Sequence, residues 1–510
     1  FGGNFWDYSI SGITNGVPGA GLPQLEILLI GRNGEAHSAE ISVGPNASAL
    51  RALTTQGFSG YTKHAFTQSL AWSDISAGGN LTVRVRTPDR LSVSYIRLRY
   101  PQATNASSSS KKFFELRANG SGKSYIEIAG APAGALLYDV TNPAEAVRIG
   151  TTSTATLNAV VPYTSSARKL ILFNQSAVSA SPAVQEITFR QINPSAYNYI
   201  IISNPELMKP ALGYSDVVSA YAEYRASGAG GSYSPIVVDI HELYNQFNYG
   251  EISPRAIRQF MKFMLNTGAP EYLFLIGKAL EVNYGYHRSP SSFTTFKDLV
   301  PTAGLPGSDT HFTAGLSGTT YEPAVPTGRL SVTNPVEIGN YLNKVKEMEP
   351  LPFDALWRKN ILHLSGGGSA QELDFFRTYL EGFQKEAEDH YLGGKVKAVA
   401  KQSTDLEFIN ISEQINNGLN LVTFFGHSAP QITDVEIGYV TNPALGYDNP
   451  GKYPMFLVNG CSAGTFFSTF TVFGEDWINA ANKGAVGVLA HSSYGLAPAL
   501  RRYSELFYHY

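Results

Sequence analysis

The sequence predicts a multidomain chain, in which N-terminal all-β, sandwich-like modules precede an α/β domain with a mainly parallel sheet. Three observations support this prediction. The chain has 510 residues, more than one hydrophobic core can hold, so about three domains are expected. Residues 1–195 contain short segments of strand composition separated by turn residues. From about residue 197, buried strands alternate with helices, which is the pattern of right-handed βαβ units.

The β-rich half is expected to form two modules. Its strands carry apolar and β-branched residues, and two of them alternate clearly between apolar and polar positions. The Ser-rich stretch 102–112 is typical of a solvated linker, so the modules are predicted at 1–105 and 106–195. The expected strands lie at residues 25–30, 81–86, 93–100, 124–128, 135–140 and 169–173.

The second half is expected to form an α/β region of two subdomains, residues 196–350 and 351–510. Its strands are short, uniformly apolar runs, as in a parallel sheet covered on both faces. One helix begins with Ser253-Pro254, which places proline at its first turn. The expected strands are 197–203, 235–240, 272–277, 360–365, 421–425, 455–459 and 485–490, and the expected helices are 212–227, 254–266, 336–349 and 371–389.

The composition excludes several classes of protein. Apolar residues make up 43% and charged residues 15%, which indicates a folded chain rather than a disordered one. A net charge of −3 argues against a nucleic-acid partner. No apolar run reaches 18 residues, so we expect no membrane span in the chain. The start without methionine and the apolar-aromatic end at 506–510 suggest a trimmed chain that continues further.

Cys461, the single cysteine, and His427 follow two of the short apolar runs in the same way. Each run ends at a glycine, Gly426 or Gly460, directly before the polar residue. Because the carboxyl ends of parallel strands meet at one edge of a sheet, we expect the thiol and the imidazole to face one crevice. A cysteine nucleophile with a histidine base is a catalytic pair. A buried core cysteine and a structural histidine are the alternative reading.

The second half also resembles a known family of enzymes, the gingipain-type cysteine peptidases of the caspase-like clan. The matching motifs span roughly three hundred residues. The β-rich region ahead of them is more similar to the cell-surface sortases of the type IX secretion system than to a secreted gingipain. The motifs are the strand 272–277, Ser308-Asp309, Gly328-Arg329-Leu330, Gly426-His427 and Cys461.

The resemblance implies a thioester mechanism. The Cys461 thiolate would attack a peptide carbonyl, and His427 would move the proton. The backbone N–H groups of Cys461 and Ser428 would form the oxyanion hole. The family has glycine after its histidine, where this chain has Ser428.

The resemblance leaves the third catalytic residue open. Gingipains place a glutamate after the strand that matches 362–365, where this chain has three glycines. The nearest carboxylates, Glu372 and Asp374, are the candidates to orient His427. Gly366 and Gly367 would leave room beside a substrate. The family's Gly-Asp after the strand 272–277 is replaced by Gly277-Lys278.

Two further candidates have structural alternatives. Asp309 could ligate a structural calcium ion, although Ser-Asp after Pro-Gly is first a turn. His491 follows the strand 485–490 and could line the pocket or belong to an ordinary strand-end loop. No cofactor is required for the expected chemistry.

The sortase-like resemblance implies a specific function at the cell surface. The enzyme would remove the C-terminal signal domain of type IX cargo and attach the new C-terminus to an amine of anionic lipopolysaccharide. It would act on the extracellular face of the outer membrane, beside a β-barrel shuttle protein of the PorV type. A secreted gingipain-like endopeptidase and a non-catalytic β-rich scaffold with a degenerate peptidase domain are the alternatives.

Overall fold

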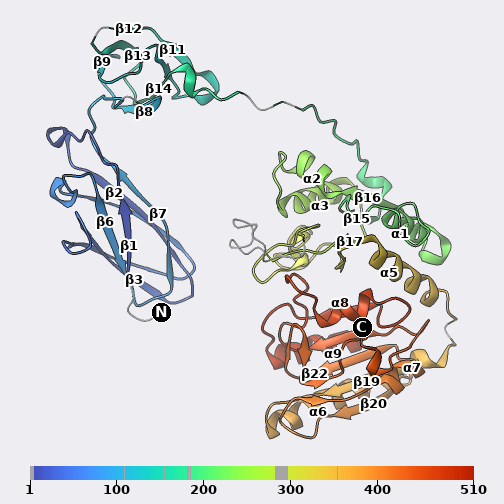
Figure 1. Ribbon diagram of the computed structural model, residues 1–510. Coiled ribbons are helices and arrows are strands. Elements are labelled where there is room, and N and C mark those ends of the chain that lie inside the picture. The colour runs from blue at the N-terminus through green and yellow to red at the C-terminus, as the bar shows by residue number, and fades with distance from the viewer. Residues whose placement is uncertain are drawn as a thin grey trace. The chain divides into compact units, whose positions relative to one another are not determined.

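The computed structural model describes residues 5–510 except 108, 154, 181–182, 184, 282–296 and 353. The chain divides into two compact units, Phe1–Val184 and Gln185–Tyr510. The first contains antiparallel sheets and the second contains parallel sheets with helices (Figure 1). The predicted fold class is therefore confirmed. No helix among these described residues is long and apolar enough to cross a membrane.

Two antiparallel sheets share one core at the start of the first unit. In β2, every second side chain is buried, as expected for a strand with one face on a core. Leu25, Ile27 and Leu29 of this strand pack with Ile41 and Val83 of the other sheet. One sheet consists of β1 (Phe5–Ile10), β6 (Leu81–Arg86), β3 (Ala36–Gly44) and β4 (Arg51–Ser59), and the other of β5 (Lys63–Ser69), β2 (Gln24–Gly31) and β7 (Leu91–Arg99).

A second pair of antiparallel sheets follows along the chain and has a core of its own. Ile126 and Ile128 of one sheet pack with Leu137 and Leu172 of the other. One sheet has the order β11 (Val147–Ile149), β10 (Leu136–Asp139), β14 (Arg168–Phe173) and β8 (Lys111–Leu116), and the other β12 (Thr151–Ser153), β13 (Leu157–Pro162) and β9 (Lys123–Ile128).

The second unit begins with a four-stranded, fully parallel sheet that is covered on both faces. Helices α2 and α3 bury Leu243 and Phe260 against one face. Helices α1 and α5 bury Tyr221 and Leu342 against the other. The strand order is β16 (Pro235–Asp239), β15 (Tyr199–Ser203), β17 (Tyr272–Ile276) and β18 (Thr327–Leu330), and the helices are α1 (Val217–Ala226), α2 (Ile240–Phe247), α3 (Arg255–Thr267) and α5 (Pro335–Met348).

A five-stranded parallel sheet forms the rest of the second unit, so the parallel strands divide between two sheets. Phe376 and Phe383 of α6 pack on one face beside Phe425. Ile415 of α7 and Trp477 of α8 pack on the other. The strand order is β20 (Lys395–Ala400), β19 (Asn360–Ser365), β22 (Leu421–Phe425), β26 (Met455–Asn459) and β27 (Gly487–Ala490), and the helices are α6 (Ala370–Ala387), α7 (Ser412–Asn417), α8 (Phe473–Asn479) and α9 (Ala497–His509).

Two short strand pairs form in the segments that connect the strands of the five-stranded sheet. A tight hairpin after His427 pairs Ser428 with Thr433 in antiparallel register. A small parallel pair lies next to it along the chain. The hairpin strands are β23 (Ser428–Ala429) and β24 (Ile432–Thr433), and the parallel pair is β21 (Glu407–Phe408) and β25 (Val435–Glu436).

Lys344 of α5 joins the layers of the two parallel sheets. Its side chain is fully buried. Its Nζ donates to the carbonyl oxygens of Ile478 at 2.6 Å and Ala485 at 2.9 Å, and to those of Lys483 and Trp477 at 3.2 and 3.4 Å. The ammonium group therefore caps carbonyls at the C-terminal end of α8. Burial lowers the pKa of Lys344 to about 7.

Lys344 should make the stability of the second unit depend on pH above neutrality. Its pKa is about 7 in the folded chain, against an ordinary value of 10.5, so the unfolded chain binds more protons between these values. Stability should therefore rise with pH in this window, and below pH 7 the full cost of burying the charge is present. In urea unfolding, the free energy of unfolding of the wild type relative to that of Lys344→Met should increase by on the order of 2 kcal/mol from pH 7 to pH 9.

The control is Lys262→Met, which removes an exposed ammonium group from α3. Its difference from the wild type should stay the same at both pH values. An equal pH slope for Lys344→Met and the wild type would contradict the assignment.

Candidate active site

Cys461 and His427 lie at the same edge of the five-stranded sheet. Strands β22 and β26 are adjacent and parallel, with Phe425 opposite Asn459 at their carboxyl ends. His427 and Cys461 each follow two residues later. The His427 side chain is 54% exposed and Cys461 is partly buried. Because the two strands run parallel, both polar residues emerge at one edge of the sheet.

A direct hydrogen bond ties the two strand ends together. The Ser428 hydroxyl donates to the Cys461 carbonyl oxygen at 2.8 Å. The approach is close, because a Cβ on Gly460 would lie 2.1 Å from Ser428 Oγ. The glycine before the cysteine is thus needed for the contact. The sequence assigned Ser428 a backbone role only, and its hydroxyl bond was not foreseen.

The loop after β27 contacts the thiol through Gly495. The Gly495 N–H donates to Cys461 Sγ at 3.4 Å, and the Gly495 carbonyl oxygen lies 3.8 Å from the sulfur. Ser462 N–H donates to the Ser493 carbonyl at 2.8 Å, and Ser462 has a φ of +57°, a left-handed conformation that is unusual for serine. The nucleophile candidate therefore sits on a strained turn held by the neighbouring loop.

The backbone N–H of Cys461 can donate to a substrate oxygen without first losing another hydrogen bond. Among the described residues, this N–H donates to no acceptor, and the sulfur is not hydrogen-bonded to His427. Such a free N–H suits the oxygen of a tetrahedral intermediate. Ser428, the other oxyanion-hole candidate, begins the hairpin strand β23.

His427 contacts one of the two candidate orienting residues. Its Nε2 lies 3.1 Å from Glu372 Oε2, whereas Asp374 is exposed and its carboxylate has no hydrogen bond or ion pair within the described chain. Glu372 sits in the first turn of α6, where Ser369 caps the helix by accepting from the Glu372 N–H at 3.2 Å. The Gly368 N–H donates to the same Oε2 at 2.9 Å. The bond from His427 and then that from Gly368 lower the pKa of Glu372.

The glycine run 366–368 accommodates a carboxylate that the sequence did not reveal. A Cβ on Gly366 would lie 2.1 Å from Asp434 Oδ1. The Gly367 N–H donates to Asp434 Oδ2 at 2.8 Å, and buried Lys401 pairs with the same oxygen at 3.3 Å. Asp434 therefore fills the side of Gly366 and Gly367 that faces it, and the role of these glycines beside a substrate stays a prediction. The glycines let Asp434 fix the loop that presents Gly368 to Glu372.

His491 lies beside the Cys461 turn through its backbone. Its carbonyl accepts from the Gly464 N–H at 2.9 Å. Its imidazole is exposed and forms a local contact, with Nδ1 3.0 Å from the Ser493 carbonyl oxygen. The loop of His491 thus borders the thiol, while its side chain stays within that loop.

Asp309 is held by an arginine. Its Oδ2 accepts from Arg329 Nε at 2.6 Å, and its Oδ1 accepts from Arg329 Nη2 and the Thr302 hydroxyl, both at 2.9 Å. Arg329 also donates to the carbonyls of Gly277 and Val300, both at 2.7 Å. These bonds favour a structural role for Asp309 over a calcium ligand. No group of three or more His, Cys, Asp or Glu residues in the described parts of the chain could hold a metal ion.

The pKa of Glu372 provides a test of the contact with His427. The carboxylate is favoured in the folded chain, so the contact stabilises the site at neutral pH and is lost as pH falls through the lowered pKa. In His427→Ala, the pKa of the Glu372 carboxyl, measured by ¹³C NMR titration, should rise toward its ordinary value of 4.5. The return should be partial, because the bond from Gly368 remains. Asp374→Asn is the control and should leave the Glu372 titration unchanged; an unmoved titration in His427→Ala would rule the contact out.

Comparison with known proteins assigns the second unit to a family. The profile described as Peptidase family C25 matches residues 192–510. Among solved structures, dimeric latent PorU from Porphyromonas gingivalis is similar at 15% identity and a TM-score of 0.45, over 67% of this chain and 34% of that chain. The chain thus spans about a third of the PorU chain.

Gingipain R (RgpB), an Arg-specific cysteine proteinase, is similar at 16% identity and a TM-score of 0.46, over 63% of this chain and 68% of that one. The complex of the pro- and mature domains of RgpB from Porphyromonas gingivalis is similar at 15% identity and a TM-score of 0.45, over 61% and 67%. Among curated proteins, none matches the sequence. Because the family profile covers more than half of the chain, the protein belongs to peptidase family C25, the gingipain family of cysteine peptidases.

Proposed function

We propose that the protein is a cysteine peptidase of the sortase type, which forms a thioester through Cys461 and passes the acyl group to an amine. The observation that carries the proposal is the placement of Cys461 and His427 at one sheet edge, tied by Ser428, with Glu372 on the imidazole. This arrangement supplies a nucleophile, a base and an orienting carboxylate.

The chemistry uses these groups in two stages. Cys461 Sγ attacks the substrate carbonyl carbon, the peptide C–N bond breaks, and His427 passes the thiol proton to the leaving amine. The free N–H of Cys461 can donate to the oxyanion, with Ser428 N–H as the second donor; such a donor contributes about 3 kcal/mol. In the second stage an amine attacks the thioester, the C–S bond breaks, and the amine proton returns through His427 to sulfur.

The contacts seen at the site require one adjustment during catalysis. Cys461 Sγ bonds to Gly495 rather than to His427, so the imidazole must approach the sulfur when substrate binds. Hydrogen bonds of catalytic groups are commonly long before the substrate complex forms. The exposed His427 ring, fixed at Nε2 by Glu372, leaves its other nitrogen for this approach.

The substrate and location proposed here follow the motif resemblance. The substrate would be type IX cargo, cut before its C-terminal signal domain, and the acceptor would be an amine of anionic lipopolysaccharide. The enzyme would work on the extracellular face of the outer membrane with a PorV-type shuttle protein. The open sheet edge, with a 54% exposed histidine, supports access by a second, bulky nucleophile. Hydrolysis of proteins by the same pair is the competing function.

The fate of the acyl group decides between these functions. Cys461→Ala should abolish processing of signal-bearing cargo, because the thioester cannot form. With the wild type, an added amine such as a glycine peptide should raise the share of conjugated product, measured as the intact mass of the new C-terminus. If only free carboxylate is produced at every amine concentration, the protein is a hydrolase. If Cys461→Ala still processes cargo, the proposed nucleophile is wrong.

Glu372 and Asp374 form a matched pair that tests the orienting residue. Glu372→Gln keeps the size of the side chain but weakens its bond to His427, so kcat should fall about tenfold or more, with KM nearly unchanged. Asp374→Asn, on the same helix but without a contact to His427, should keep wild-type kcat. Equal activity of the two variants would contradict the role of Glu372.

A further inference from the structure

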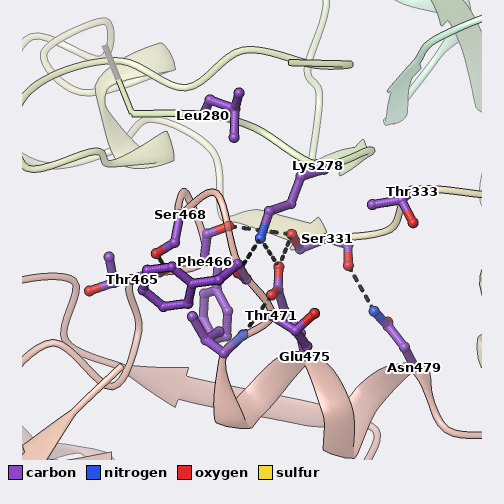
Figure 2. Close-up of polar contacts among 12 residues, drawn as sticks. Lys278, Leu280, Ser331, Thr333, Thr465, Phe466, Ser468, Thr471, Glu475 and Asn479 are labelled. Atoms are coloured by element: carbon purple, nitrogen blue, oxygen red, sulfur yellow. Dashed lines mark hydrogen bonds and ion pairs between the residues drawn. The ribbon is translucent and has the colours of Figure 1, made fainter. Parts of the chain in front are cut away.

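A buried ion pair connects the two parallel sheets close to the segment that follows Cys461. Lys278 comes directly after β17 and Gly277, and Glu475 lies in the first turn of α8. Lys278 Nζ and Glu475 Oε1 are 2.5 Å apart, and the two side chains are only 2% and 5% exposed. Figure 2 shows Lys278 reaching down to Glu475, with Phe466 and Thr471 beside the pair.

The Glu475 carboxylate accepts two further hydrogen bonds, one from the first sheet's side and one from the residue before α8. Ser331, which follows β18 of the first sheet, donates its hydroxyl to Oε1 at 2.5 Å. Val472 N–H donates to Oε2 at 3.0 Å, which fixes the residue that precedes α8. Asn479, at the end of α8, donates to the Ser331 carbonyl at 2.9 Å. Glu475 therefore fastens the beginning of α8 to the carboxyl ends of the first sheet.

The segment between Cys461 and α8 is held from the same side. Lys278 Nζ also donates to the Phe470 carbonyl at 3.5 Å, and the Glu281 N–H donates to the Phe467 carbonyl at 2.8 Å. Ser331 lies 3.5 Å from the Phe466 carbonyl oxygen. Three carbonyls of this segment thus face donors from the loops that follow β17 and β18 of the first sheet.

The nucleophile turn is built on this held segment. Thr465 N–H and Thr465 Oγ1 both donate to the Ser462 carbonyl, at 3.1 and 2.7 Å, which closes the turn directly after Cys461. The Ser468 hydroxyl donates to the Thr465 carbonyl at 2.6 Å. These turn bonds and the contacts of the ion pair fall on one short segment, 462–472, whose backbone connects the pair to the residue next to Cys461.

The pair is electrostatically costly to separate. Burial lowers the pKa of Lys278 and raises that of Glu475, and the attraction between the two groups opposes both shifts. Removal of one partner leaves an uncompensated buried charge, whereas replacement of both by apolar side chains is often tolerated.

From this geometry, we propose that Lys278 and Glu475 are positioning residues for the Cys461 nucleophile. The pair holds residues 462–472 against the first sheet, and this support fixes the turn that presents the thiol. The proposal rests on the proposed function of Cys461 for its catalytic part. It also gives a role to Lys278, which stands where the family motif has an acidic residue.

The test separates local positioning from overall stability. The double variant Lys278→Met with Glu475→Leu removes the charges and the bonds to residues 470 and 472. We expect it to fold, to exchange amide hydrogens in 462–472 about tenfold or more faster, and to lose about tenfold or more in kcat with KM nearly unchanged. The matched control is Arg225→Met with Glu349→Leu, an ion pair between α1 and the residue that ends α5, which should leave exchange in 462–472 and kcat unchanged.

A milder variant guards against loss of the fold. Ser331→Ala removes one hydrogen bond from Glu475 and leaves both charges, and it should raise exchange in 462–472 and lower kcat by a smaller factor. Wild-type exchange in 462–472 for a folded double variant, or for Ser331→Ala, would overturn the proposal, as would wild-type kcat in the double variant. Hydrogen exchange does not depend on catalysis, so a failure of the peptidase proposal, shown by an active Cys461→Ala, would be recognised separately.

Discussion

The parallel pairing of β22 with β26 is the constraint on which the candidate active site depends. The strands run parallel, with Phe425 opposite Asn459, so the residues that follow them emerge at one edge. The contacts of Cys461 and His427 at this edge are then made by residues of short loops and of one helix start. Ser428 bonds to Cys461, Gly495 contacts the sulfur, and Glu372 contacts His427.

The site is supported in two layers of different character. The layer nearest the chemistry uses single hydrogen bonds between loop residues, which are partly exposed and can rearrange. The layer behind it uses buried charges, with Lys401 and Asp434 behind the histidine side and Lys278 and Glu475 behind the cysteine side. Buried ion pairs tolerate little displacement, so this second layer of buried charges limits how far the loops can move.

The fold, and the placement of His427 and Cys461 at one sheet edge, could be predicted because they depend on local patterns. Alternation of apolar residues identified the strands, and strand-to-glycine junctions identified His427 and Cys461. The residue that orients His427 could be narrowed only to Glu372 or Asp374, because the rotation of the helix about its axis decides which side chain faces the histidine. Asp434 and the Ser428 hydroxyl were beyond prediction, since their partners come together through loop conformations. The partner of Lys278 lies 197 residues away along the chain, and no local signal links the two.

The buried ammonium group of Lys344 has a consequence for how this chain can be divided. Its acceptors are carbonyls at the end of α8 and just beyond it, in the layer of the other parallel sheet. A cut between α5 and β19 would strand the charge on one fragment and leave uncapped carbonyls on the other. The two parallel sheets therefore have to be inherited together. Recombination that exchanges accessory domains should join chains near residue 185 rather than near residue 350.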